Sequence, residues 1–184
     1  PELAARFERE FGLHVHESLG MTEMAGISTI TPLGVNGLPG CVGFRLPHTQ
    51  MRIVELDADG GASGRDVAPG EPGMVLFKSP NVFSGFLDAA DTAKAFTPDG
   101  WLITGDIGYL DRDERLNLSG RAKDLIIRSG HNIEPKTIED AIGAHHAVQL
   151  AAAVGAPDAY EGELTEGFAK PVTSKHHRRH ETRG

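Results

Sequence analysis

The stretch WLITGDIGYLDRDERLNLSGRAKDLIIRSGHNIEPKTIE occupies residues 101–139, and the rest of the chain is organised around it. It predicts a strand that ends at Asp106, a turn over residues 111–114 and a second strand over residues 116–118. The carboxylate of Asp106 and the guanidinium of Arg121 then flank one hairpin, so we expect both to reach the same small volume. Such a pair suits a polar ligand that carries hydroxyls and an anionic group.

Each of these two residues also has an ordinary structural interpretation. An Asp that follows Thr-Gly can cap a turn, and an exposed Arg often forms a surface salt bridge that contributes little to stability. The presence of Asp106 and Arg121 on either side of a single hairpin favours the functional interpretation of both.

Three motifs follow one another in this stretch: TGD at residues 104–106, GRxKD at 120–124 and GxNIxPxxIE at 130–139. In this order and spacing they resemble the AMP-forming acyl-CoA synthetases, an adenylate-forming family that also contains luciferases and the adenylation domains of peptide synthetases. The resemblance extends over residues 1–164.

The resemblance implies roles for four residues of these motifs. Asp106 and Arg121 would hold the ribose of ATP or AMP. Lys123 would lie at the hinge between two domains, a position that must tolerate a large change of backbone angles. Gly130 would let the pantetheine arm of CoA approach the backbone.

A second candidate site precedes these motifs, in the sequence Ser18-Leu19-Gly20-Met21-Thr22-Glu23. A hydroxyl and a carboxylate after a Gly-containing turn can meet a nucleotide phosphate and its magnesium ion, although Thr22 could equally cap a helix. The segment is similar to the family motif YGxTE. The resemblance implies Thr22 on the AMP phosphate, Glu23 on Mg²⁺, and the backbone around Ser18, Leu19 and Gly20 against the adenine. Leu19 replaces the aromatic residue that is usual there.

The elements predict a mixed α/β fold in several parts. A helix over residues 2–11 reads as the end of an α/β subdomain. Residues 1–120 would belong to a large AMP-binding domain, with a β-rich subdomain over about 44–119. Residues 121–164 would form part of a mobile C-terminal α+β domain, and residues 165–184 a divergent, disordered tail.

Residues 26–43 contain many Gly and Pro residues and predict a long loop. In the family, the corresponding region lies beside the acyl pocket. Its small apolar side chains favour an apolar acyl chain over a charged acid.

Charge and composition exclude several classes of protein. Residues 165–184 hold five Lys or Arg and two Asp or Glu, a net +3, which leaves −11 on residues 1–164. An acidic body argues against nucleic-acid binding, and no apolar run is long enough for a membrane span. The single cysteine, Cys41, excludes an internal disulfide and fits a reducing cytoplasm. We interpret Cys41 as a small buried hydrophobe rather than a nucleophile.

Two other patterns suggest metals, but each has a simpler interpretation. His14 and His16 lie two residues apart on a predicted strand over residues 13–16, yet no third ligand is near in the sequence. The acidic turn over residues 57–61 lacks the later carboxylates of a calcium loop, so a hairpin is favoured.

The sequence therefore predicts part of an acid–thiol ligase that joins a small carboxylic acid, in particular a fatty acid, to CoA with ATP and Mg²⁺. Neither the family's phosphate loop nor its adenylation lysine is recognisable in the chain, so impaired turnover is expected. Three alternatives stay open: a non-catalytic remnant that binds AMP or CoA, an adenylation domain that loads a carrier protein, and an interaction fragment without a ligand.

Overall fold

The structure, a computed structural model, describes residues 2–35, 40–57, 60–129 and 131–172. It divides into two compact units, Pro1–Lys123 and Asp124–Gly184. The sequence predicted a boundary after residue 120, whereas Arg121 ends a strand that belongs to the first unit.

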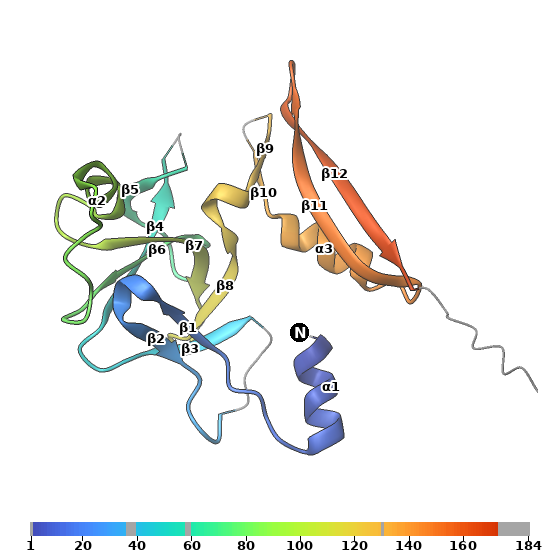
Figure 1. The fold of residues 1–184 in the computed structure, drawn as a ribbon, viewed down its shortest axis with the longest axis horizontal. Coiled ribbons are helices and arrows are strands. Elements are labelled where there is room, and N and C mark those ends of the chain that lie inside the picture. The colour runs from blue at the N-terminus through green and yellow to red at the C-terminus, as the bar shows by residue number, and fades with distance from the viewer. Residues whose placement is uncertain (1, 36–39, 58–59, 130, 173–184) are drawn as a thin grey trace, which may run out of the picture. The chain divides into compact units, whose positions relative to one another are not determined.

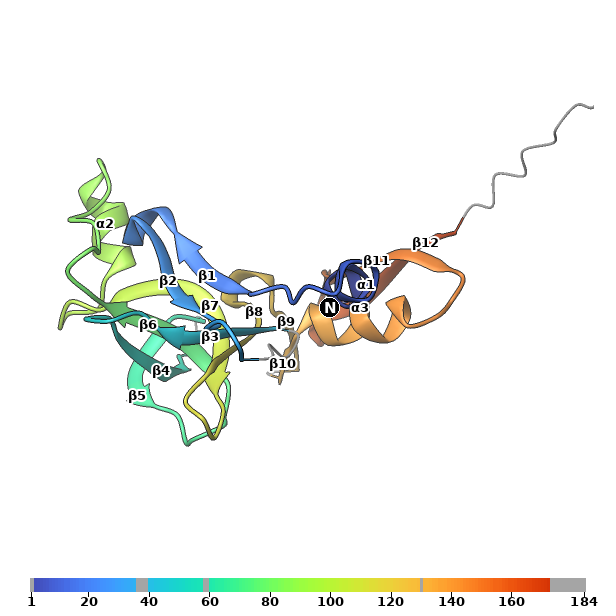
Figure 2. The same ribbon diagram turned by 90° about the horizontal axis from the view of Figure 1, so that it is seen from below.

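An antiparallel sheet dominates the described part of the first unit (Figure 1), in the order β1-β2-β3-β8-β7-β6-β4-β5. Its strands are β1 (Ser18–Met21), β2 (Gly26–Ile30), β3 (Cys41–Arg45), β4 (Gln50–Leu56), β5 (Ala62–Asp66), β6 (Gly73–Lys78), β7 (Leu102–Leu110) and β8 (Leu116–Arg121). The hairpin of β1 and β2 can be followed in Figure 2.

Short helices accompany this sheet. The predicted helix over residues 2–11 is present as α1 (Glu2–Phe11). A 3-10 turn, η1 (Thr22–Met24), follows β1, and α2 (Ala89–Ala95) precedes β7. Asp88 caps α2, because its carboxylate accepts a 2.7 Å hydrogen bond from the main-chain nitrogen of Ala90.

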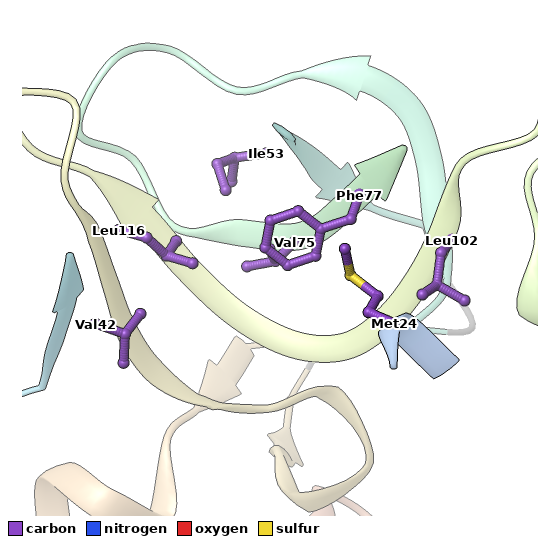
Figure 3. Close-up of a cluster of buried hydrophobic side chains, with 7 residues drawn as sticks. All are labelled: Met24, Val42, Ile53, Val75, Phe77, Leu102 and Leu116. Carbon is purple, nitrogen blue, oxygen red and sulfur yellow. The ribbon is translucent and has the colours of Figure 1, made fainter. Parts of the chain in front are cut away.

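The hydrophobic core of the first unit lies between the strands of its curved sheet. Phe77 and Val75 of β6 are fully buried and lie centrally in Figure 3. The other buried members come from η1, β3, β4, β7 and β8: Met24, Val42, Ile53, Leu102 and Leu116. The core thus joins the η1 turn to the same strands that carry Asp106 and Arg121.

Two predictions for the N-terminal region were wrong. Residues 26–43 are not one long loop, because β2 and β3 lie in them and pair with each other. Gly43 has a φ of +79°, and a Cβ there would lie 2.2 Å from the carbonyl of Ile30, so this glycine permits close approach of the two strands. Residues 13–16 form no strand either.

The second unit contains a sheet in the order β10-β9-β12-β11 over its described residues. Its elements are β9 (Ile126–Arg128), β10 (His131–Ile133), α3 (Pro135–Gly143), β11 (Val148–Asp158) and β12 (Gly162–Pro171). Helix α3 packs against the long β11–β12 hairpin. The sequence predicts a helix over residues 135–143 that begins with a proline, and Pro135 is at the start of α3. A second 3-10 turn, η2 (Ala122–Asp124), spans the division between the units.

The prediction of a disordered tail from residue 165 was wrong for the residues up to 171. They belong to β12, which pairs with β11 along its length. Ala169 and Phe168 lie opposite Ala151 and Ala152. The mixed α and β class of the fold is confirmed.

Candidate nucleotide site

The TGD motif forms a bulge inside β7. The prediction that the strand ends at Asp106 was therefore wrong, because β7 continues to Leu110. Ile103 pairs with Leu76 and Ile107 pairs with Met74, so Thr104, Gly105 and Asp106 stand opposite one residue of β6. The Thr104 hydroxyl donates to the carbonyl of Val75 at 2.9 Å and accepts from the main-chain nitrogen of Asp106 at 3.0 Å. Gly105 adopts a φ of +77°, which is unfavourable for other residues. This bulge determines where the Asp106 carboxylate points.

Asp106 and Arg121 face each other across β7 and β8 as directly paired residues. Arg121 Nε donates to Asp106 Oδ1 at 3.0 Å. The Asp106 side chain is 11% exposed and that of Arg121 is 50% exposed. Burial raises the pKa of Asp106, and the positive charge and hydrogen bond of Arg121 offset part of that rise.

Asp106 keeps acceptor capacity for a ligand. Among the hydrogen bonds between described residues, only Oδ1 of its carboxylate takes part, in the bond with Arg121. Two neighbouring hydroxyls could therefore donate to the acceptor positions of this carboxylate that remain open. A ribose has such a pair of hydroxyls.

The turn that carries Thr22 and Glu23 joins β1 to β2. A Cβ on Gly20 would lie 2.7 Å from the carbonyl oxygen of Gly26, so this glycine is required by close strand packing whatever it binds. Within the turn, Thr22 is exposed and Glu23 is half-buried. The carbonyl of Glu23 accepts a 2.8 Å hydrogen bond from the nitrogen of Phe83, which anchors the turn.

A cavity of about 420 Å³ brings parts of the two motifs together within the first unit. Glu23, Thr104 and Arg121 line it, whereas Asp106 does not and is linked to it only through the hydrogen bond from Arg121. The helix α2 contributes Asp91 and Lys94. An opening with both cationic and carboxylate side chains suits a nucleotide and its metal ion.

Several predicted site residues lie elsewhere. In the described part of the chain, Ser18, Leu19, Gly20 and Thr22 do not line this cavity. Leu19 packs against the hydrophobic core instead. Lys123 is exposed at the division between the units, and Gly130 lies outside the described residues.

Glu23 fits a magnesium ion that is held mainly by a ligand. Mg²⁺ often takes only one or two protein carboxylates and completes its shell with water and phosphate oxygens. Among the described residues, no group of three or more His, Cys, Asp or Glu side chains is placed to hold a metal by itself. Glu23 and Asp91 both line the cavity, and one or two such carboxylates are consistent with this chemistry.

The two histidines considered as metal ligands have protein partners. The Nδ1 atom of His16 lies 3.1 Å from the carbonyl oxygen of Thr31. His14 Nδ1 lies 3.2 Å from Glu8 Oε1. These contacts connect the segment after α1 to its surroundings.

Sequence reasoning missed the wall of the cavity that α2 provides. Asp91 and Lys94 sit on a short surface helix, and their side chains lie 3.7 Å apart as an i, i+3 pair. This pattern is common on exposed helices. No local signal marks these residues, because only the tertiary packing of α2 beside β7 brings them to the cavity.

No helix in the described part of the chain is both long and apolar enough to cross a membrane.

Comparison with known proteins places these features in a family. Residues 1–87 match the family of AMP-binding enzymes. The chain is 41% identical to the sulfoacetate–CoA ligase of Cupriavidus necator, covering 89% of this chain and 31% of the relative. It is 36% identical to a long-chain-fatty-acid–CoA ligase of Salmonella typhimurium, covering 90% of this chain and 28% of the relative.

A solved structure agrees with these relatives. The crystal structure of ATP-bound MatB from Rhodopseudomonas palustris superposes with a TM-score of 0.83 at 34% identity, covering 91% of this chain and 32% of that one. The chain thus spans about a third or less of the length of these proteins. With the TGD bulge, the Asp106–Arg121 pair and the Glu23 turn in one unit, the chain resembles AMP-binding enzymes over residues 1–87 and CoA ligases over about nine tenths of its length.

Proposed function

We propose that this chain carries part of the nucleotide site of an ATP-dependent, AMP-forming carboxylic acid–CoA ligase. The observation that supports this most directly is the pairing of Asp106 with Arg121, the residue of the pair that lines a cavity together with Glu23. In this proposal Asp106 accepts hydrogen bonds from the two ribose hydroxyls, and Arg121 fixes the carboxylate and contacts the sugar. Charge-assisted hydrogen bonds of this kind orient a ligand strongly.

The proposed reaction has two steps. A substrate carboxylate attacks the α-phosphate of ATP, which forms the acyl-adenylate and releases pyrophosphate. The CoA thiol then attacks the acyl carbon and loses its proton, which gives acyl-CoA and AMP. When bound beside Glu23, Mg²⁺ would neutralise phosphate charge. The part of Asp106 and Arg121 is to hold the ribose in place.

Other residues of the motifs take supporting roles in this proposal. Thr22 contacts the AMP phosphate, and the backbone of Ser18, Leu19 and Gly20 borders the adenine. Lys123 is the hinge between the two units, and its place at their division supports this role. Gly130 would border the CoA arm.

The acid is proposed to be a fatty acid. The segment after η1 presents Ile27 and Ile30 with 45% and 37% of their surfaces exposed, and these side chains could line an apolar acyl site. The relatives named above differ in their acids, one a long-chain fatty acid and the other sulfoacetate. The acidic composition and the lone buried Cys41 support a cytoplasmic location.

Calorimetry on the full chain tests the nucleotide site. We expect saturable binding of AMP and weaker binding of 2′,3′-dideoxy-AMP, because the latter lacks both hydroxyls that Asp106 would accept from. Equal affinity for the two nucleotides, or no heat with AMP at millimolar concentration, would contradict the ribose assignment.

Turnover is measured separately, as pyrophosphate release with ATP, Mg²⁺ and a panel of fatty and aromatic acids. We expect the 184-residue chain to release little pyrophosphate, because no GxxxxGK[ST]-type phosphate loop occurs in its sequence. AMP binding without turnover would fit a binding remnant equally well. Turnover at an ordinary enzymatic rate would show that the chain needs no such loop.

A further inference from the structure

A second cavity in the first unit has a chemistry of its own. It measures about 490 Å³ and lies where β4 begins and β6 ends. Its polar lining consists of Arg45, His48, Thr49, Gln50, Lys78 and Ser79. Among these lining side chains there is no carboxylate, although the chain as a whole carries a net charge of −8.

Main-chain carbonyls accept hydrogen bonds from both cations of this cavity, and Lys78 Nζ also lies 5.9 Å from the centroid of the Trp101 ring and interacts electrostatically with Asp99. Arg45 Nη1 donates to the carbonyl of Thr49 at 3.0 Å. Lys78 Nζ donates to the carbonyl of Asp99 at 2.9 Å. Among the described residues, neither cation lies within 4.0 Å of a carboxylate oxygen. A guanidinium has five N–H donors, so Arg45 retains donors for a ligand.

A β-turn between β3 and β4 holds His48 at the cavity. The Leu46 carbonyl accepts a 3.1 Å hydrogen bond from the main-chain nitrogen of Thr49, and His48, with a φ of +65°, is the third residue of this turn, directly after Pro47. The adjacent Thr49 is 2% exposed, so the turn is anchored beside the imidazole.

Hydrogen bonds fix Thr49 and Ser79, two of the residues that line the cavity. The buried Thr49 hydroxyl donates to Ser79 Oγ at 3.3 Å, and Ser79 donates to the Asn81 side chain. The Asn81 amide in turn donates to the carbonyl of Met24 in η1. Thr49 and Ser79, which line the cavity, are therefore fixed in position by their links to the rest of the unit.

We propose that this cavity binds a phosphate group, supplied either as a free anion or as the phosphomonoester of a larger molecule. The guanidinium of Arg45 suits a phosphate because its planar N–H groups match two oxygens at once. His48 and Gln50 add further donors. This site is separate from the cavity of Glu23 and Arg121, and the proposal stands whether or not AMP binds there.

Calorimetry at constant ionic strength tests this proposal on the full chain, with inorganic phosphate, pyrophosphate, CoA and dephospho-CoA as separate probes. Saturable binding of phosphate or pyrophosphate identifies a free anion. Tighter binding of CoA than of dephospho-CoA identifies a phosphomonoester. We expect Arg45→Gln and His48→Gly each to weaken the bound probe at least about fivefold. Glycine adopts a left-handed φ readily, so His48→Gly should not destabilise the fold, and weaker binding by this variant would reflect the loss of the imidazole.

Arg112→Gln is the matched control, because it removes an exposed arginine from the β7–β8 turn of the same unit. It should leave the affinity unchanged. The proposal is wrong if none of the four probes gives saturable heat. It is also wrong if Arg112→Gln weakens binding as much as Arg45→Gln, since a general charge effect would then suffice.

Discussion

Replacing Asp106 by Asn tests the central assignment of the candidate site. The substitution keeps the shape of the side chain but removes the charge that would accept from two ribose hydroxyls. Hydrogen bonds to a charged group contribute about 1.5–3 kcal/mol. The affinity for AMP should therefore fall about ten- to a hundredfold, measured by calorimetry on the full chain.

A comparison of ligands separates this effect from a general disturbance of the site. The Asp106→Asn variant should bind AMP and 2′,3′-dideoxy-AMP with equal affinity, because the lost interaction involves only the hydroxyls. Asp113→Asn is the matched control, since that carboxylate is 69% exposed on the same hairpin and pairs with Arg115. If Asp106→Asn weakens both nucleotides to the same extent, the carboxylate does not act on the ribose and the reasoning fails.

The same variant has a distinct dependence of stability on pH. Burial raises the pKa of Asp106, and Arg121 only partly offsets it. An acid whose pKa is higher in the folded state destabilises the fold above that pKa, and stability increases as the pH falls through it. The wild-type chain should therefore lose stability relative to Asp106→Asn as the pH rises from the ordinary value of 3.8 through the folded pKa. Urea unfolding at a series of pH values measures this difference.

Two further substitutions test the fold. Gly43→Ala should lower the free energy of unfolding by more than about 2 kcal/mol, since a left-handed φ alone costs about 1–2 kcal/mol and the new Cβ would clash with Ile30. Gly120→Ala is the control, because its new Cβ meets open space. It should change the free energy of unfolding little in the same urea titration. Burial would raise the pKa of Asp111, but hydrogen bonds from Arg115 lower that pKa overall. The ionised Asp111 therefore stabilises the fold above the ordinary pKa of 3.8, and this stabilisation is lost as the pH falls through the folded pKa. Asp111→Asn should accordingly lose less stability than the wild type between about pH 5 and about pH 2, and an equal loss would contradict this account.

Alternating and periodic patterns predicted most of the regular elements. The sequence alternates over residues 51–56 and is mostly apolar over residues 73–78, which predicts two strands, and the structure has β4 and β6 there. The helix at residues 135–143 has the expected proline at its first turn. In these segments the local pattern and the tertiary environment favour the same structure.

The missed strands lack such patterns because their pairing is decided elsewhere in the chain. The strand β5 has the sequence ASGRD, with no apolar alternation, and is held by pairing with β4. Its Asp66 also accepts a 2.8 Å hydrogen bond from Arg52 of β4. In β3, Gly43 looks like a loop residue in the sequence, whereas its lack of a side chain is what lets β2 approach.

The sequence predicted the pairing of Asp106 with Arg121, but not the backbone around them, and Ser18, Leu19, Gly20 and Thr22 do not line the cavity. The motifs placed Asp106 and Arg121 together, and they are cross-strand partners. The bulge at residues 104–106 could not be anticipated, because it depends on the register between β6 and β7, which the local sequence does not specify. The contribution of α2 to the cavity depends on tertiary packing in the same way.

The bulge explains why one member of the pair is rigid and the other adaptable. Thr104 bonds the backbone of Asp106 on one side and the carbonyl of Val75 on the other, so the carboxylate is fixed by β6 before any ligand arrives. Arg121 lies at the end of β8 with half of its side chain exposed, and it can adjust its contacts at little cost to the fold. A prearranged acceptor lowers the entropy that a ligand must lose on binding. Nucleotide binding in this unit should therefore move the Arg121 side chain while the backbone of the TGD bulge stays in place.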